Sequence, residues 1–159
     1  MSKFLLILHV LAAIVAIGPV TVAASRFPQE ARRALADPAD PGAVSTVRQL
    51  HRICTVYAYV GVAVPILGIV TGASMGVLGS TWLTVSMMLT AFAAVVLGGL
   101  ILPGQSAIVA RLYGPRTDAG PLPGREATVR LAMLTGVFNL LWAAVTILMI
   151  VRPGSTTGA

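Results

Sequence analysis

The side chains of this sequence that could coordinate a cofactor are two histidines and two adjacent methionines. His9 lies in FLLILHVLAAIVAIGPVTVAA, an uncharged run over residues 4–24, whereas His51 lies among arginines. Met87 and Met88 lie in another uncharged run. Imidazole and thioether groups can bind Cu(I), and a His–Met pair can hold a haem iron. We therefore take His9, Met87 and Met88 as the candidate cofactor-binding residues.

The two histidines cannot share one haem. At about 1.5 Å of rise per helical residue, His9 lies about 8 Å from the middle of its run, and His51 lies about 18 Å on the other side of the middle of its own. The predicted axial separation is about 26 Å, whereas two axial ligands of one iron lie about 4 Å apart. We interpret His51 as a residue of the membrane interface.

Three interpretations of His9 stay open: a ligand of copper or haem, a residue of proton or quinone chemistry, and a packed side chain. A buried imidazole is expected to be neutral and bonded to a backbone carbonyl or a hydroxyl. Methionine is a common filler of packed helices. The packed interpretation is favoured, so no cofactor is predicted, with haem or copper as the alternative.

The composition is that of a membrane protein. The chain is 57% hydrophobic and 10% charged, with a mean hydropathy of +0.90, whereas a soluble domain is about 25% charged. Four uncharged runs reach the length of about 20 residues that crosses a bilayer, and a spanning segment has to be helical to pair its own backbone. We predict an all-α fold, a bundle of four transmembrane helices forming a single integral membrane domain, 1–159, with spans at 4–24, 53–73, 82–102 and 131–151.

The basic residues predict the topology. Five arginines lie within residues 25–52 and four within 103–130, whereas the connection 74–81 has none. The positive-inside rule places 25–52 and 103–130 in the cytoplasm as loops, with both termini outside, in a bacterial plasma membrane. Cleavage of the first run as a signal peptide would put all nine arginines outside, so this alternative is rejected. The net charge of +6 is then explained by topology, and no nucleic-acid partner is predicted.

Turn residues predict local structure in the loops. Pro28 suits the start of a short helix that ends near Ala36, before two Asp-Pro pairs. Asp40 can cap a helix whose first residue is Pro41 and which continues into the second span. Pro103 should mark the cytoplasmic end of the third span, as a stop or as a kink.

Small residues recur at a spacing of four in each span, which allows close packing of helix backbones in lipid. Asn139, near the middle of the fourth span, needs a hydrogen-bond partner, and Thr135 or Thr90 is the simplest choice. These stripes predict a tight bundle, or a bundle that associates with a second copy or another membrane protein. The predicted packing residues are Gly68, Gly72, Gly76, Ala94, Gly98, Gly136 and Asn139.

Four segments carry a family resemblance: LLILHVLAAIVAIGP, TGASMGVLGSTWLTVSMML, LILPGQSAIVARL and TILMIVRPG. Together they resemble small bacterial membrane proteins of domain-of-unknown-function family 2269. The Leu8–His9 pair is also similar to the start of copper-resistance D-type membrane proteins. The first resemblance implies the fold and leaves the activity open, and the second implies copper near His9 and Met87.

No catalytic residue is predicted. The spans contain no Asp, Glu, Lys or Arg, the only cysteine is Cys54, and no phosphate-binding glycine motif is present. We therefore expect an accessory or assembly protein that acts through helix packing. The alternative is a haem- or copper-binding redox or metal-handling protein that uses His9, and a small-molecule transporter comes third, because no carboxylate in a span could carry a proton or cation.

Overall fold

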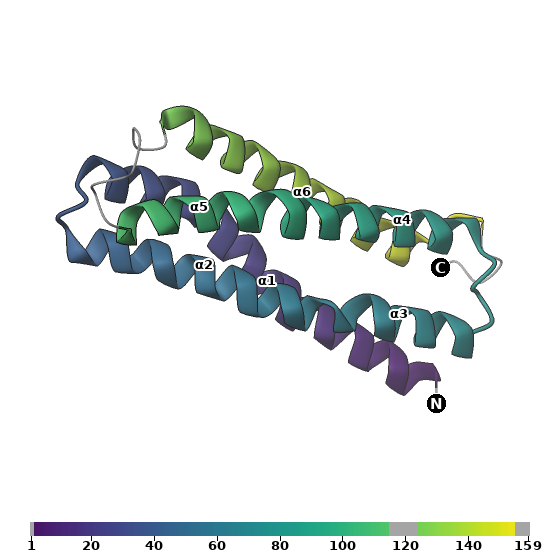
Figure 1. Ribbon diagram of the computed structural model, residues 1–159. Coiled ribbons are helices and arrows are strands. Elements are labelled where there is room, and N and C mark those ends of the chain that lie inside the picture. Colours follow the sequence, from purple (N-terminus) through teal and green to yellow (C-terminus); the bar gives the residue numbers. More distant parts are fainter. Residues whose placement is uncertain (1, 115–123, 155–159) are drawn as a thin grey trace.

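The protein folds into long antiparallel helices (Figure 1). The structure is a computed structural model that describes residues 2–114 and 124–154, and every regular element in these ranges is helical. The elements are α1 (Ser2–Ala36), α2 (Pro41–Gly61), α3 (Ala63–Ser74), α4 (Thr81–Val95), the π-helical segment η1 (Val96–Ile101), α5 (Leu102–Tyr113) and α6 (Arg125–Val151). They form four rods, because α2 leads through Val62 into α3, and α4 leads through η1 into α5.

Each of the four rods is long and apolar enough to cross a membrane. This agrees with the predicted four-helix membrane bundle. The first residue of α1 and the last residue of α6 lie at one end of the bundle, which we call the terminal end (Figure 1). The turn from α1 to α2 lies at the opposite end, which we call the arginine-rich end.

Most of residues 25–52 is helical, as predicted, but the expected short helix from Pro28 to Ala36 is the end of α1 and not a separate element. The helix α1 continues through Pro28 to Ala36, and α2 begins at Pro41, so only residues 37–40 are non-helical. Only the start of a separate helix at Pro28 was wrong, because arginines exclude a segment from lipid without disfavouring the continuation of a helix. The predicted end of the first helix at Ala36 and the predicted start of the next helix at Pro41 are confirmed. Asp40 caps α2, its Oδ1 accepting from the Gly42 N–H at 2.8 Å.

The second predicted loop, 103–130, is also largely helical where the structure describes it. The helix continues through Pro103 to Tyr113, and α6 begins at Arg125, while residues 115–123 lie outside the described ranges. Pro103 therefore does not end the third rod. A proline lacks the N–H of an α-helical hydrogen bond and its ring crowds the carbonyl four residues earlier. The wider π-helical turns of η1, just before Pro103, accommodate this conflict.

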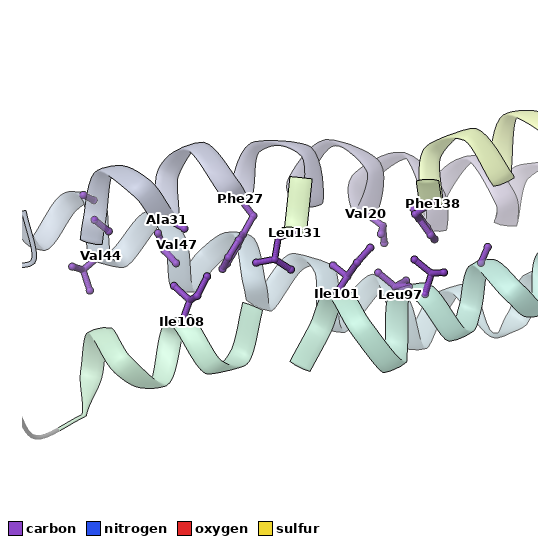
Figure 2. Packing of buried hydrophobic residues seen from close by; sticks show 14 residues of the cluster. Val20, Phe27, Ala31, Val44, Val47, Leu97, Ile101, Ile108, Leu131 and Phe138 are labelled. Carbon is purple, nitrogen blue, oxygen red and sulfur yellow. The ribbon is translucent and has the colours of Figure 1, made fainter. Parts of the chain in front are cut away.

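The closely packed core fills the arginine-rich half and the middle of the bundle (Figure 2). Alanines of α1 and α2 let the two helices approach closely. Larger side chains, including Phe27, Ile108 and Phe138, are almost completely buried between the rods. The core is made by Val20, Phe27, Ala31, Ala34, Ala43, Val44, Val47, Ala93, Val96, Leu97, Ile101, Ile108, Leu131 and Phe138.

The terminal half is packed differently. The helices α3 and α4 follow one another in sequence but make few contacts, and each packs mainly on another helix, α3 on α1 and α4 on α6. Pro65 contributes to this arrangement, because α2 ends at Gly61, four residues before the proline, and the chain turns at Val62 before α3. The divergence of α3 and α4 opens a space inside the bundle.

Candidate functional site

A cavity of about 1120 Å³ lies in the terminal half, between α1, α3, α4 and α6. Its size is at or above the upper end of the range for small-molecule sites. Most of its wall is apolar, and it is partly open to the outside of the bundle. Glycines and alanines on the wall leave the space that larger side chains would fill. The polar residues on the wall are His9, Thr71, Thr90, Thr146, the two tryptophans and Arg152.

His9 is fixed on the α1 side of this cavity, where only 8% of the residue is exposed. Its Nδ1 lies 3.1 Å from the carbonyl oxygen of Val64 on α3. A carbonyl can only accept, so Nδ1 carries the proton and donates it, and in the neutral ring Nε2 is then a lone-pair acceptor. The predicted bond to a backbone carbonyl is confirmed. Nε2 has no hydrogen-bond partner in the described ranges.

Gly68 makes room for the imidazole. A Cβ atom at Gly68 would lie 3.0 Å from His9 Cε1, which is closer than side chains normally approach. The pair His9–Gly68 therefore sets the approach of α1 to α3. Gly68 is one of the predicted packing residues, and its neighbour on α1 is His9.

The two candidate methionines separate in the structure. Met87 lies on the cavity wall, as does Met149 of α6, and it is 42% exposed. Met88 is 69% exposed and lies outside the cavity. Among the described residues, no group of three or more His, Cys, Asp or Glu could hold a metal. A metal in this cavity would therefore depend on His9 with thioethers.

Asn139 has a different partner from either of those predicted. Its Nδ2 donates to Ser25 Oγ on α1 at 3.2 Å, and its Oδ1 has no partner among the described residues. Thr90 instead donates to the Ser86 carbonyl of its own helix. The prediction was wrong because α6 packs against α1 as well as α4, and the spacing of polar residues does not reveal which neighbour lies opposite.

The predicted packing residues fall into three groups. Gly72 faces Leu83, whose Cδ2 would lie 3.0 Å from an added Cβ, so it serves contacts within the chain, as Gly68 does. Gly98 and Gly136 have no atom within 4 Å of such a Cβ, and Ala94 is an exposed residue of the cavity wall. Gly76 lies in the turn after α3 with φ +69°, a conformation that favours glycine.

Sequence reasoning missed the role of both tryptophans. Trp82 of α4 and Trp142 of α6 line the cavity, and neither indole Nε1 has an acceptor among the described residues. A buried donor without a partner costs about 1–3 kcal/mol. The sequence suggests only an aromatic belt for Trp82, because an indole at a helix end is common there.

A second polar group lies in the arginine-rich half. Gln105 of α5 is 1% exposed, its Oε1 lies 3.2 Å from His51 Nδ1, and its Nε2 lies 3.6 Å from Cys54 Sγ. His51 is thus half-buried and hydrogen-bonded to Gln105 inside the bundle. Val64, which bonds His9, follows His51 by thirteen residues, or about 20 Å of helix. The two histidines therefore belong to separate sites.

No family model, no curated protein and no solved structure matches this chain. The cavity is therefore the feature of this chain from which we infer a function.

Proposed function

We propose that this chain is a small multi-pass membrane protein that binds a largely apolar molecule of the bilayer in the cavity between α1, α3, α4 and α6. It would act as an accessory or carrier protein, with no chemical step of its own. The observation that carries the proposal is the cavity of about 1120 Å³ with mostly apolar walls. Helices in lipid are held together by packing contacts, so an unfilled space of this size would forfeit much of what stabilises the terminal half.

The depth of the cavity supports this proposal. Its wall on α4 extends from Trp82 to Ala94, and its wall on α6 from Trp142 to Arg152. These stretches correspond to about 18 Å and 15 Å of helix rise. Half of a hydrocarbon core of about 30 Å is about 15 Å. The cavity therefore has the depth of one bilayer leaflet, and a molecule can enter it sideways from that leaflet.

Filling the cavity should remove the bound molecule. Ala143→Phe places a ring on the cavity wall, and we expect retention of co-purified apolar molecules to fall at least several-fold. Native mass spectrometry of the detergent-solubilised protein measures this retention. Ala132→Phe is the matched control, because Ala132 is an exposed residue of the same helix outside the cavity. Equal retention by both variants and the wild type would count against a ligand in this cavity.

We propose further that the terminal end faces outward and the arginine-rich end faces the cytoplasm of a bacterial cell. The support is the nine arginines of residues 25–52 and 103–130. In a Cys54→Ser background, Asp118→Cys should resist a membrane-impermeant maleimide in intact cells and react after the membrane is opened. Gly79→Cys, in the turn between α3 and α4, should react in intact cells. The reverse labelling pattern would show the opposite topology and contradict this proposal.

The second candidate function is the binding of haem or copper by His9. The observation that favours it is the hydrogen bond from Nδ1 to the Val64 carbonyl. Histidines that bind a metal usually donate their other ring N–H to such an acceptor, which fixes the ring and leaves the second nitrogen for the metal. Met87 lies on the wall of the same cavity. The resemblance of the Leu8–His9 segment to copper-resistance D-type proteins points to the same chemistry.

Association with a second copy or another membrane protein remains part of the proposal. Gly98 and Gly136 face outward with no atom near an added Cβ. A neighbouring helix could approach the backbone closely at these positions.

A further inference from the structure

Arg152 lies at the mouth of the cavity, at the terminal end of the bundle. It ends α6 in the left-handed conformation, with φ 45°, and its backbone N–H bonds the Leu148 carbonyl. Its Nε donates to the Met149 carbonyl at 3.3 Å, and the guanidinium lies 5.6 Å from the centroid of the Trp82 ring on α4. Arg152 therefore bridges the ends of α4 and α6 on the wall of the cavity.

The described chain supplies no anion to this cation. Glu30, Asp37 and Asp40 lie near the turn from α1 to α2, and Glu126 lies in the first turn of α6, all at the arginine-rich end. The ion pair between Arg33 and Asp40 also lies there. The terminal end of the described chain instead carries a second cation, Lys3, which lies outside the cavity. The two terminal guanidinium nitrogens of Arg152 are left without a partner in the described ranges.

The tryptophans add a second, independent demand for an acceptor. Trp82 is 8% exposed, and its indole N–H is unpaired within the described part of the chain. Trp142 lies ten residues from Arg152 on α6, deeper in the same cavity, and has an unpaired N–H as well. A purely apolar molecule would leave the guanidinium at the mouth without a partner. A guanidinium binds carboxylate and phosphate groups through parallel charge-assisted hydrogen bonds.

We infer that the molecule held in the cavity is an anionic amphiphile of the membrane, with its carboxylate or phosphate head at Arg152 and its apolar tail extending past His9 toward Trp142. This inference rests on the proposed function and adds the chemical class and the orientation of the ligand. The tail occupies the apolar walls over the depth of one leaflet, and the head lies where the hydrocarbon ends. The single chain of a fatty acid has both features.

The two tryptophans of the chain both line the cavity, so bromine atoms on a bound tail should quench their fluorescence. The probes are 9,10-dibromostearate and 9,10-dibromostearyl alcohol, which share a tail and differ only in the head. At pH 8 in neutral detergent micelles, we expect saturable quenching by both. The acid should reach half-saturation at a mole fraction about tenfold lower, as expected for one charge-assisted interaction.

Arg152→Gln should abolish the preference for the acid and leave binding of the alcohol unchanged. Lys3→Gln is the matched control, because it removes a cation from the same end without touching the cavity. A preference that survives Arg152→Gln, or equal saturable binding of acid and alcohol by the wild type, would overturn the inference and leave the proposed function standing. Quenching that rises linearly with both probes and is unchanged by Ala143→Phe would overturn the proposed function itself.

The orientation is tested with single-tryptophan variants. The bromines lie half-way along the tail, so they should quench Trp142 in Trp82→Phe more strongly than Trp82 in Trp142→Phe. Stronger quenching of Trp82 would mean that the tail does not extend inward from Arg152, and would overturn this orientation.

Discussion

Replacing Phe27 with alanine should lower the free energy of unfolding by about 3–5 kcal/mol. This is the cost of removing a large aromatic side chain that folding transfers from water into the core. Phe27 is completely buried between the rods. It follows the apolar run 4–24 and its neighbour in sequence is Arg26. In the proposed topology this part of α1 projects beyond the hydrocarbon. Its burial therefore removes the ring from water, and the full hydrophobic contribution is lost in the variant.

Phe138 provides the matched comparison. It is as buried as Phe27, but it lies in the middle of the apolar part of α6. Lipid chains are as apolar as the protein interior, so burial of Phe138 gains little from the hydrophobic effect. Phe138→Ala therefore loses mainly packing contacts. We expect roughly half the loss seen for Phe27→Ala. Unfolding in mixed micelles, followed by helical circular dichroism, measures both. Equal losses of unfolding free energy would show that folding transfers both rings into the core from the same medium, and would contradict this prediction.

If His9 binds haem or copper, replacing it with alanine should abolish cofactor binding completely. The wild-type protein purified from its native membrane should show a Soret band or stoichiometric copper, and His9→Ala should show neither. Nε2 of His9 is the one imidazole nitrogen on the cavity wall without a partner in the described ranges, so no other histidine could replace it. An absorption spectrum and metal analysis provide the measurement.

His9→Gln separates ligation from packing. A glutamine amide can donate to the Val64 carbonyl as the imidazole does, but it is a poor ligand of haem iron or Cu(I). A ligand role predicts that both variants lose the cofactor. A packing role predicts a colourless, metal-free wild type, with stability reduced by His9→Ala and largely restored by His9→Gln. The second result would eliminate the haem or copper candidate.

Features that depend on local chemistry were predictable from the sequence. The four apolar runs give the rods, because an uncharged run longer than about 20 residues has to pair its own backbone in lipid. Asp40 followed by Pro41 gives the start of α2. The hydrogen bond of His9 to a carbonyl follows from the need of a buried imidazole for a partner.

Features that depend on how the rods face one another were not predictable. The bond of Asn139 to Ser25 requires knowing that α6 packs against α1 at that depth. The cavity requires the divergence of α3 from α4, and the separation of Met87 from Met88 requires the rotation of α4 about its axis. That α1 is one helix across Pro28, and that the third rod continues through Pro103, was missed for another reason. Bilayer thickness limits the apolar run but not the helix, and the 35 residues of α1 extend over about 52 Å, whereas a hydrocarbon core is about 30 Å thick.

The π-helical segment η1 also bears on how this protein would be compared with relatives. A π-helical turn holds about one residue more than an α-helical turn, so an insertion of one residue into an ordinary helix leaves this trace. Each α-helical residue turns the chain by about 100°, and α5, whose Gln105 lies beside His51 and Cys54, follows directly after η1. A homologue with a regular helix here should align with a one-residue gap within Val96–Ile101. Its α5 would then present a different set of side chains to α2.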